Sequence, residues 1–191
     1  MSFFDKIELW DQKLLLLING CNSEVLDVIM WIVTSKSFGI PVYVVFALVF
    51  YKIFGVKKAL IFCALVIVAV SISDLTAKYC FKEVFERFRP THHEILKGKL
   101  HIVNNYRGGK YGFISSHASN MFSFAVMVFL LIREKIRWLL LPLILWASLI
   151  SYSRMYLGVH YPSDIIVGAL VGSVIAGIVY YLAKQFNWIK C

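Results

Sequence analysis

Long apolar runs, separated by short polar stretches, dominate this chain from residue 40 onward. Runs of this length and uniformity are typical of helices in a bilayer, because strands are shorter and usually alternate apolar with polar residues. Some runs fall short of the ~20 residues that cross a bilayer, so we expect the helices to continue into their flanks. The pattern predicts five membrane-spanning helices, at residues 40–54, 59–77, 118–132, 138–152 and 165–183.

Two shorter helices are predicted before the first long run. Residues 3–18 carry an apolar stripe at helical spacing with charged residues away from it, and an Asn-Gly pair then ends the helix. The second helix starts at a cap residue, Asn22 or Ser23, and continues to about Ser35. It is too short and too charged to be predicted as a span. We expect both helices to lie in or dip into the membrane interface.

Composition also places the chain in a membrane. Hydrophobic residues make up 60% of the 191 residues, charged residues 16%, and the mean hydropathy is +0.74, whereas soluble chains average about 45–50% and about 25%. A soluble protein of this size cannot bury so much apolar surface. This excludes a typical cytosolic enzyme, a disordered chain and a nucleic-acid-binding domain with a solvated surface.

The predicted fold is an all-α membrane protein. It consists of a bundle of about five to six transmembrane helices with an N-terminal amphipathic interfacial helix. We expect a single domain over residues 1–191, with the interfacial helices in 1–37 and the bundle in 38–191.

The net charge of +9 is typical of a membrane chain whose Lys and Arg residues lie at helix ends and near anionic lipids. Tight hairpins at 54–58 and 133–137 fall on the same side as the C-terminal tail. The only acid on this side is Glu134, and its bases are Lys57, Lys58, Arg133, Lys135, Arg137, Lys184 and Lys190. The positive-inside rule makes this side cytoplasmic. On the opposite side, which we expect to face the exterior, bases are interleaved with acids.

Polar clusters at the ends of predicted spans carry the residues with chemical potential. They lie on that second side, at residues 82–90, 113–117 and 153–164. Three cations, Lys82, Arg89 and Arg154, stand beside apolar helices, where a charge is costly unless it meets an opposite charge. The Arg guanidinium matches the geometry of phosphate oxygens, and Lys adds a point charge. The cations therefore indicate an anion site at the membrane face.

Two histidines accompany these cations. His117 follows Ser115 and Ser116 where a helix should begin, and free N–H groups at a helix start favour an anion. His160 precedes Asp164 by four residues, and a carboxylate on one imidazole nitrogen raises the basicity of the other. A nucleophile and an acid are available, but the residues alone do not say which histidine is which. The set predicts phosphoryl transfer by positioning and electrostatics.

No metal site or cofactor is predicted. No cluster of Asp, Glu or His has the spacing of a two-metal phosphatase, and His92, His93 and His101 match no common metal motif. The four cysteines contain no CxxC pair, which argues against a zinc site and a disulfide framework.

Each cluster taken singly has a simpler interpretation, because bases at span ends are commonly interfacial anchors. Only their joint occurrence on one face favours an enzyme. A transporter or channel predicts charges in mid-span, whereas these lie at one face. A catalytically inactive lipid-binding scaffold predicts loss of a nucleophile or an acid, whereas His117, His160 and Asp164 are all present.

The three clusters resemble the three-part signature of the type-2 phosphatidic acid phosphatase superfamily, which contains membrane lipid phosphatases and soluble vanadium haloperoxidases. The matching motifs are Lys82-x6-Arg89-Pro90, Ser115-x-His117 and Ser153-Arg154-x5-His160-x3-Asp164. The first and third match completely, within a resemblance that covers about residues 74–175. In the second, Ile114 and Ser116 replace the usual Pro and Gly; Ser116 keeps a backbone N–H for phosphate, and its side chain is expected to alter the loop or narrow the pocket.

The resemblance implies an integral membrane lipid phosphatase that works through a phosphohistidine. His160 would attack phosphorus, Asp164 would orient His160, and His117 would protonate the leaving oxygen and then activate water. The residues that would hold the phosphate oxygens are Lys82, Arg89, Ser115, Ser116 and Arg154.

The implied substrate is an envelope lipid with a phosphate or a diphosphate. Undecaprenyl diphosphate, lipid A phosphates and phosphatidylglycerophosphate stay open as candidates. We expect a protein of the bacterial inner membrane whose active site faces the periplasm or exterior, with the bilayer and its lipids as partners and no nucleic acid. A haloperoxidase is disfavoured because the chain is not soluble.

Overall fold

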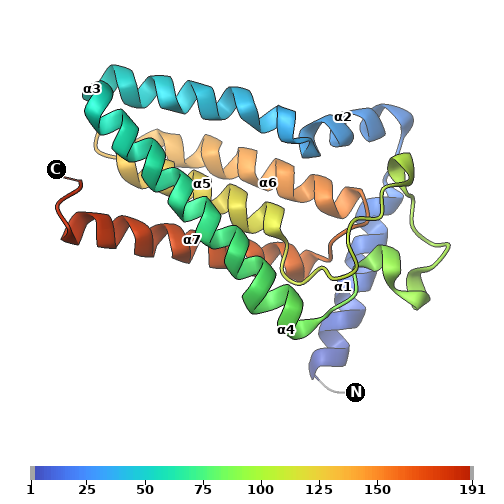
Figure 1. Cartoon of the computed structure of the whole chain (residues 1–191). Coiled ribbons are helices and arrows are strands. Elements are labelled where there is room, and N and C mark those ends of the chain that lie inside the picture. Colours follow the sequence, from blue (N-terminus) through green and yellow to red (C-terminus); the bar gives the residue numbers. More distant parts are fainter. Residues whose placement is uncertain (1–2, 190–191) are drawn as a thin grey trace.

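The computed structural model describes residues 3–189, which fold as a helical bundle (Figure 1). The prediction of an all-α membrane protein is confirmed. The longer helices are α1 (Phe3–Gly20), α2 (Glu24–Thr34), α3 (Lys36–Leu75), α5 (Ser116–Ile132), α6 (Leu140–Tyr156) and α7 (Pro162–Gln185). A π-helical stretch, Thr76–Lys82, and the short α4 (Glu83–Phe85) extend α3, and 3-10 turns lie at Pro90–His92, Glu94–Leu96, Val103–Asn105 and Arg137–Leu139.

The predicted hairpin at 54–58 lies within α3. Gly55 has φ 77° and ψ 169°, a conformation that favours glycine because a side chain is strained at positive φ. The chain reverses there, so the two predicted runs, 40–54 and 59–77, pack as neighbouring helical segments (Figure 1). The other three predicted runs lie within α5, α6 and α7.

Three helical stretches are long and apolar enough to cross a membrane: Ser37–Phe85, Arg137–Tyr156 and Pro162–Gln185. The first folds back on itself at Gly55. Helices α1 and α2 would give a fourth candidate if together they formed one broken span, but the chain bends by 115° between them. Helix α5 is apolar and has only 17 residues.

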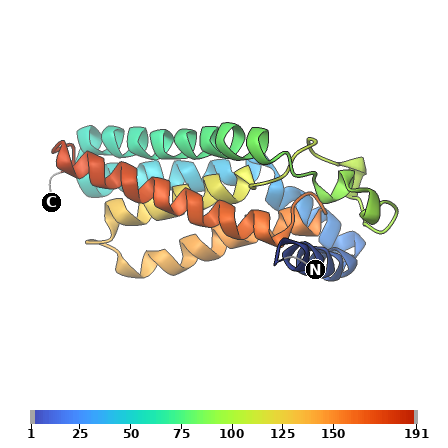
Figure 2. The same ribbon diagram turned by 90° about the horizontal axis from the view of Figure 1, so that it is seen from below.

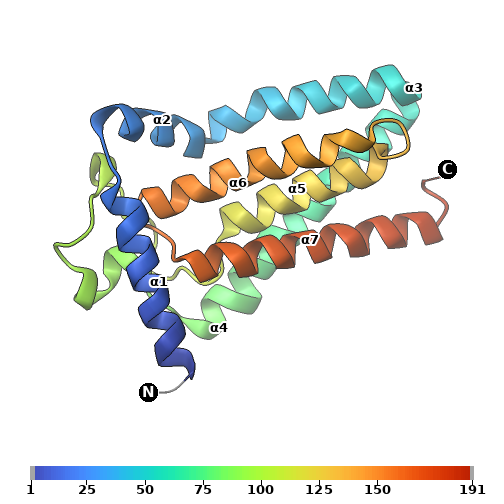
Figure 3. The same cartoon turned by 180° about the vertical axis from the view of Figure 1, so that it is seen from behind.

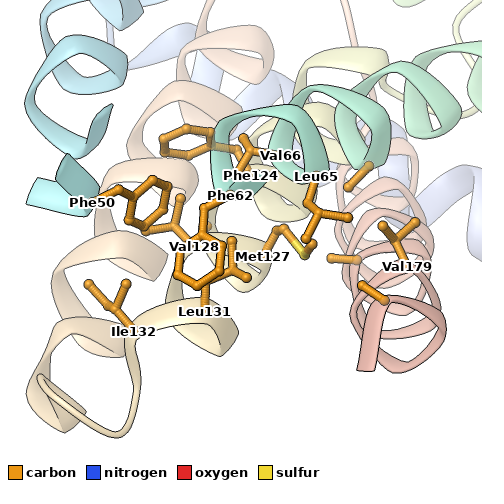
Figure 4. Close-up of a cluster of buried hydrophobic side chains, with 14 of the residues drawn as sticks. Phe50, Phe62, Leu65, Val66, Phe124, Met127, Val128, Leu131, Ile132 and Val179 are labelled. Carbon is orange, nitrogen blue, oxygen red and sulfur yellow. The ribbon is translucent and has the colours of Figure 1, made fainter. Parts of the chain in front are cut away.

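The core lies between the two halves of α3, α5, α6 and α7 (Figure 4). Aromatic and aliphatic side chains such as Phe50, Phe62 and Val128 are almost fully buried there. Helix α7 approaches α5 closely at Gly168 and Gly172; a Cβ at Gly168 would lie 2.8 Å from the Ser115 carbonyl oxygen. Small residues four positions apart let helix backbones approach in a membrane. This contact brings the first turn of α5 beside the first turns of α7.

The outer surface of the bundle is apolar. Leu60, Leu141 and Leu170 are more than 60% exposed, which a soluble fold rarely repeats over a whole surface but which the lipid tails of a bilayer would cover.

The two ends of the bundle contain different elements. The turn at Gly55, the connection between α5 and α6, and the C-terminal end of α7 gather at one end, while α1, the loops and the start of α7 gather at the other (Figures 1 and 2). This is the grouping that the charge pattern predicts; Lys190 lies outside the described residues.

Helix α1 runs across the second end of the bundle (Figure 3). Its predicted apolar stripe faces outward, with Trp10 50% and Leu17 66% exposed. The face against the protein carries Asp11, Leu15 and Asn19, all buried. If α1 lies in the membrane interface, this outward apolar face would contact lipid. The second helix begins at Glu24, and its N-cap is Ser23, whose side chain accepts from the Leu26 N–H.

Candidate active site

The three polar clusters of the sequence meet at the end of the bundle crossed by α1. Lys82 Nζ donates to Ser116 Oγ at 2.6 Å, which joins the first cluster to the second. Arg89 Nη1 lies 3.2 Å from His160 Nε2, which joins the first to the third. Backbone contact completes the arrangement, since the Ser115 N–H donates to the Asp164 carbonyl at 3.1 Å.

His160 and Asp164 form a buried pair. His160 Nδ1 lies 3.2 Å from Asp164 Oδ2, and the two residues are 1% and 0% exposed. The same oxygen accepts from the Tyr161 N–H at 2.9 Å. Pro162 starts α7, so Asp164 stands in the first turn and reaches back to a histidine that lies before the helix. The two residues therefore meet through helix capping, not as neighbours on one helical turn.

The surroundings of His160 favour a neutral ring whose proton is on Nδ1 and whose lone pair is on Nε2. A guanidinium can only donate, so Arg89 Nη1 donates to Nε2, and the ring proton sits on Nδ1 facing Asp164. Burial lowers the pKa of His160 well below its usual value, and the charges of Arg89 and Arg154 lower the pKa further. An imidazole in this state is equipped to attack an electrophile through Nε2.

Arg89 and Arg154 are buried beside the pair, 8% and 2% exposed. Arg89 Nε donates to the Tyr111 carbonyl at 3.2 Å. Arg154 donates through Nη1 to Thr34 Oγ1 at 2.5 Å and through Nη2 to the Tyr106 hydroxyl at 3.0 Å. Its Nε is buried and has no hydrogen-bond partner among residues 3–189. With Lys82, these side chains concentrate positive charge around His160.

Helix α5 begins where the sequence predicts. Ser115 is the N-cap, and its Oγ accepts from the Ala118 N–H at 3.4 Å. The Ser115 N–H is used by Asp164, so Ser116 and His117 supply the N–H groups of the first turn, where a helix favours an anion. His117 lies in this turn, where a positive charge on its ring lowers the pKa of His160.

A groove of about 740 Å³ opens beside Ser116 and His117, between α3, α5 and the ends of α2 and α6. Apolar residues line much of it. Polar groups lie within the groove as well: Asn120 Nδ2 donates to Asp74 Oδ1 at 2.9 Å, and Asn120 Oδ1 is buried without a hydrogen-bond partner in the described part of the chain. Asp74 is an exposed carboxylate that follows a long apolar stretch of α3, and a carboxylate is costly in a bilayer unless it meets polar partners.

Three residues of the site were missed by the sequence analysis. Arg87 ion-pairs with Asp164, Asp11 holds Arg87, and Tyr106 binds Arg154. Asp11 had a signal, because it lies four residues after Ile7 and three before Leu14, which places a charged residue at the edge of the apolar stripe. Arg87 lies within the cluster at residues 82–90, but no motif spacing distinguishes it from the cluster's other charged residues, and Tyr106 lies in a polar loop without any motif.

No group of three or more His, Cys, Asp or Glu side chains that could hold a metal ion occurs within residues 3–189.

Comparison with known proteins shows which proteins the chain is similar to. Residues 58–188 match the family model described as PAP2 superfamily. Two curated lipid A 4'-phosphatases are each 34% identical to this chain, from Bacteroides thetaiotaomicron and Porphyromonas gingivalis. The alignments cover 93% and 94% of this chain and 78% and 76% of theirs. The crystal structure of a transmembrane PAP2 type phosphatidylglycerolphosphate phosphatase from Bacillus subtilis superposes with a TM-score of 0.73 at 18% identity, over 94% of this chain and 87% of that one.

Proposed function

The chain belongs to the PAP2 superfamily and is a membrane lipid phosphatase. We propose that it hydrolyses a phosphate monoester of a glycolipid of the lipid A type. The observation that carries the chemistry is the buried His160–Asp164 pair, whose Nε2 is flanked by cations. The whole of residues 1–191 would act as one phosphatase domain, because α1 contributes to the site that the bundle carries.

The substrate proposal rests on two supports. The relatives that align over nearly the whole chain are named lipid A 4'-phosphatases. In addition, the groove beside His117 offers the Asn120 amide and the Asp74 carboxylate among its apolar lining residues. A sugar headgroup brings hydroxyl and amide groups that satisfy such side chains, whereas a polyprenyl chain does not. A glycolipid therefore fits the groove better than undecaprenyl diphosphate.

The proposed reaction has two steps. His160 Nε2 attacks phosphorus, a P–N bond forms, and the P–O bond to the lipid breaks while His117 gives its proton to the leaving oxygen. His117 then takes a proton from water, whose oxygen attacks phosphorus and breaks the P–N bond to release inorganic phosphate. Asp164 holds the Nδ1 proton and stabilises the charged ring throughout.

Electrostatic groups would hold the transferring phosphoryl. The proposed ligands of the phosphate oxygens are Lys82, Arg89, Ser115, Ser116 and Arg154. Arg154 Nε is a buried donor available for this role. Ser115 would act through its hydroxyl, because its N–H already donates to Asp164. In this mechanism the cations and the first turn of α5 neutralise the charge that a metal ion meets in other phosphatases.

The proposed location is the bacterial inner membrane, with the site facing the periplasm or exterior. The opposite end of the bundle carries the nearly unopposed bases, including Lys57, Lys58 and Lys135, and the positive-inside rule assigns that end to the cytoplasm.

Phosphate release by the purified protein in detergent tests the proposal. The panel contains lipid A bisphosphate, undecaprenyl diphosphate and phosphatidylglycerophosphate, with the His160→Ala protein as a blank. We expect the highest kcat/KM on lipid A bisphosphate, full activity in excess EDTA, and competitive inhibition by vanadate, which mimics five-coordinate phosphorus. Truncating Arg154 should weaken vanadate inhibition together with turnover. A preference for another lipid would overturn the substrate, and activity that EDTA removes and a divalent ion restores would overturn the mechanism.

A further inference from the structure

A further arginine, Arg87, connects the His160–Asp164 pair to Asp11, a buried carboxylate on α1. Arg87 Nη1 donates to Asp164 Oδ1 at 3.0 Å and to Ser163 Oγ at 2.8 Å. Its Nη2 donates to Asp11 Oδ2 at 2.8 Å. The guanidinium also lies over the Tyr161 ring, 4.2 Å from its centroid. Arg87 is therefore held from several sides in one orientation.

Asp11 is the anchor of this arrangement. It is 0% exposed although it lies on α1, at the edge of the bundle. Its Oδ1 accepts from the Ser163 N–H at 2.9 Å, and its Oδ2 accepts from the Ser163 hydroxyl as well as from Arg87. Burying a carboxylate is costly unless it is paired and hydrogen-bonded. Both Ser163 donors lie in the first turn of α7, so Asp11 ties α1 to the helix that carries Asp164.

Arg89 and Arg87, the two arginines that hydrogen-bond to the pair, contact different members of it. Arg89 contacts the imidazole itself, at Nε2. Arg87 contacts the Asp164 oxygen that His160 does not use, since His160 and Tyr161 both share Oδ2. A carboxylate with both oxygens occupied has one orientation, and this orientation sets the direction in which the imidazole presents Nε2.

We propose that Arg87 is a positioning residue for the His160–Asp164 pair, and that Asp11 makes α1 part of the catalytic machinery by holding Arg87. The proposal rests on the proposed function, because it assigns Arg87 to the reaction that His160 performs. Arg87 acts through Asp164 and not on the substrate, so its loss should lower kcat and leave KM nearly unchanged.

The proposal also predicts a change in pH dependence. The charged groups that face His160 are Asp164, Arg89, Arg154, Lys82 and His117. Without the Arg87 guanidinium, the negative charge of Asp164 is less compensated, so the pair binds a proton at a higher pH. Whichever member of the pair holds that proton, the form with a neutral ring and an ionised carboxylate is lost. The acid limb of kcat/KM should therefore move to higher pH.

The test compares Arg87→Met, Arg87→Lys, Asp11→Asn and the double variant Asp11→Asn/Arg87→Met with the wild-type protein. Arg137→Met, at the opposite end of the bundle, is the matched control. We expect Arg87→Met to lower kcat by about 10²-fold, the scale of a misplaced catalytic group, with KM within about twofold. Arg87→Lys should recover part of kcat. Asp11→Asn should lower kcat less than Arg87→Met and add little in the double variant, because Asp11 acts through Arg87.

A second measurement separates failure of this proposal from failure of the proposed function. Histidine ring NMR, with the His160→Ala protein to assign the signal, follows the titration of His160 without any substrate. A shift of this titration to higher pH in Arg87→Met supports the proposal even if the lipid substrate proves to be wrong. Unchanged titration, additive losses in the double variant, or a rise in KM alone would overturn it. If Arg87→Met does not fold in detergent, the same criteria apply to Arg87→Lys and Asp11→Asn.

Discussion

The His160 side chain is buried between a carboxylate and a guanidinium. It is buried, its Nδ1 faces the Asp164 carboxylate, and its Nε2 faces the Arg89 guanidinium. Burial and the nearby cations lower its pKa, and the carboxylate fixes its tautomer. The arrangement suits a nucleophile that must be neutral before it attacks and charged afterwards.

Replacing His160 should therefore remove turnover without removing the fold. We expect His160→Ala to lower kcat by about 10³-fold or more, and Asp164→Asn to lower it less, because the amide disturbs an orienting partner and not the attacking atom. Radiolabelled phosphate should be trapped on the wild-type protein and not on His160→Ala. If His160→Ala keeps turnover while His117→Ala loses it, the two histidines have exchanged roles.

Asn120 should affect the choice of substrate. Its Oδ1 is buried in the groove wall without a partner in the described chain, and a site built to bond a polar substrate group discriminates against a lipid that lacks one. Asn120→Ala should lower kcat/KM on lipid A bisphosphate by about tenfold, the value of one hydrogen bond, and leave undecaprenyl diphosphate hydrolysis nearly unchanged. Ser173→Ala, whose hydroxyl bonds its own helix at Ala169, is the control. Equal losses on both lipids would contradict this role.

At the scale of elements, the contact between α5 and α7 assembles the site. Helix α5 carries Ser116 and His117 in its first turn, and α7 carries Asp164. Gly172 lets the two backbones approach, because a Cβ there would lie 3.0 Å from the Ser119 Cα. Ser119 also bonds Ser73 of α3 through their hydroxyls at 2.5 Å. The separation of α5 and α7 therefore depends on small residues at this crossing.

Gly172→Val should push α7 away from α5. We expect a loss of about 1–3 kcal/mol of stability, the cost of overpacking, seen as a lower apparent Tm in detergent, together with reduced kcat. Gly177→Val is a matched control on the same helix, because a Cβ at Gly177 meets no atom within 4 Å. Similar losses in both variants would mean that helix propensity, and not the α5 contact, determines the effect.

At the scale of the whole molecule, the two ends of the bundle have different charge. The end with the Gly55 turn carries bases and almost no acids. At the end with the site, which α1 crosses (Figure 3), bases are interleaved with acids. Between them, exposed residues such as Leu48, Val68 and Val174 cover the outside. This surface suits a bundle that stands in the bilayer with its site at one face.

Orientation can be measured with impermeant thiol reagents. In a background whose natural cysteines are replaced by serine, Lys99→Cys should react in intact cells or spheroplasts and Lys135→Cys should not, because the positive-inside rule assigns Lys135 to the cytoplasm. Lysed cells provide the control in which both should react. The reverse pattern would invert the topology and make a cytoplasmic substrate the candidate.

Local patterns in the sequence determined most of the architecture. The five apolar runs correspond to helical segments because burial in lipid depends on local composition. Ser115 marks the start of α5 and Gly55 lies in the predicted hairpin, since caps and turns depend on a few neighbouring residues. The motifs also identified residues that the fold brings together. Each motif lies at the end of a predicted span, and spans of similar length place these ends on one face.

Only the tertiary structure decided which side chains support that site. Asp11 and Arg87 are 76 residues apart and become partners only because α1 crosses the end of the bundle. The sequence predicted the apolar stripe of α1, but it did not show which elements α1 contacts. It therefore could not show that the face carrying Asp11 and Asn19 packs on the protein. The groove between α3 and α5 and its Asn120–Asp74 pair likewise depend on how two helices meet. Such contacts join residues distant in sequence, and no local pattern encodes them.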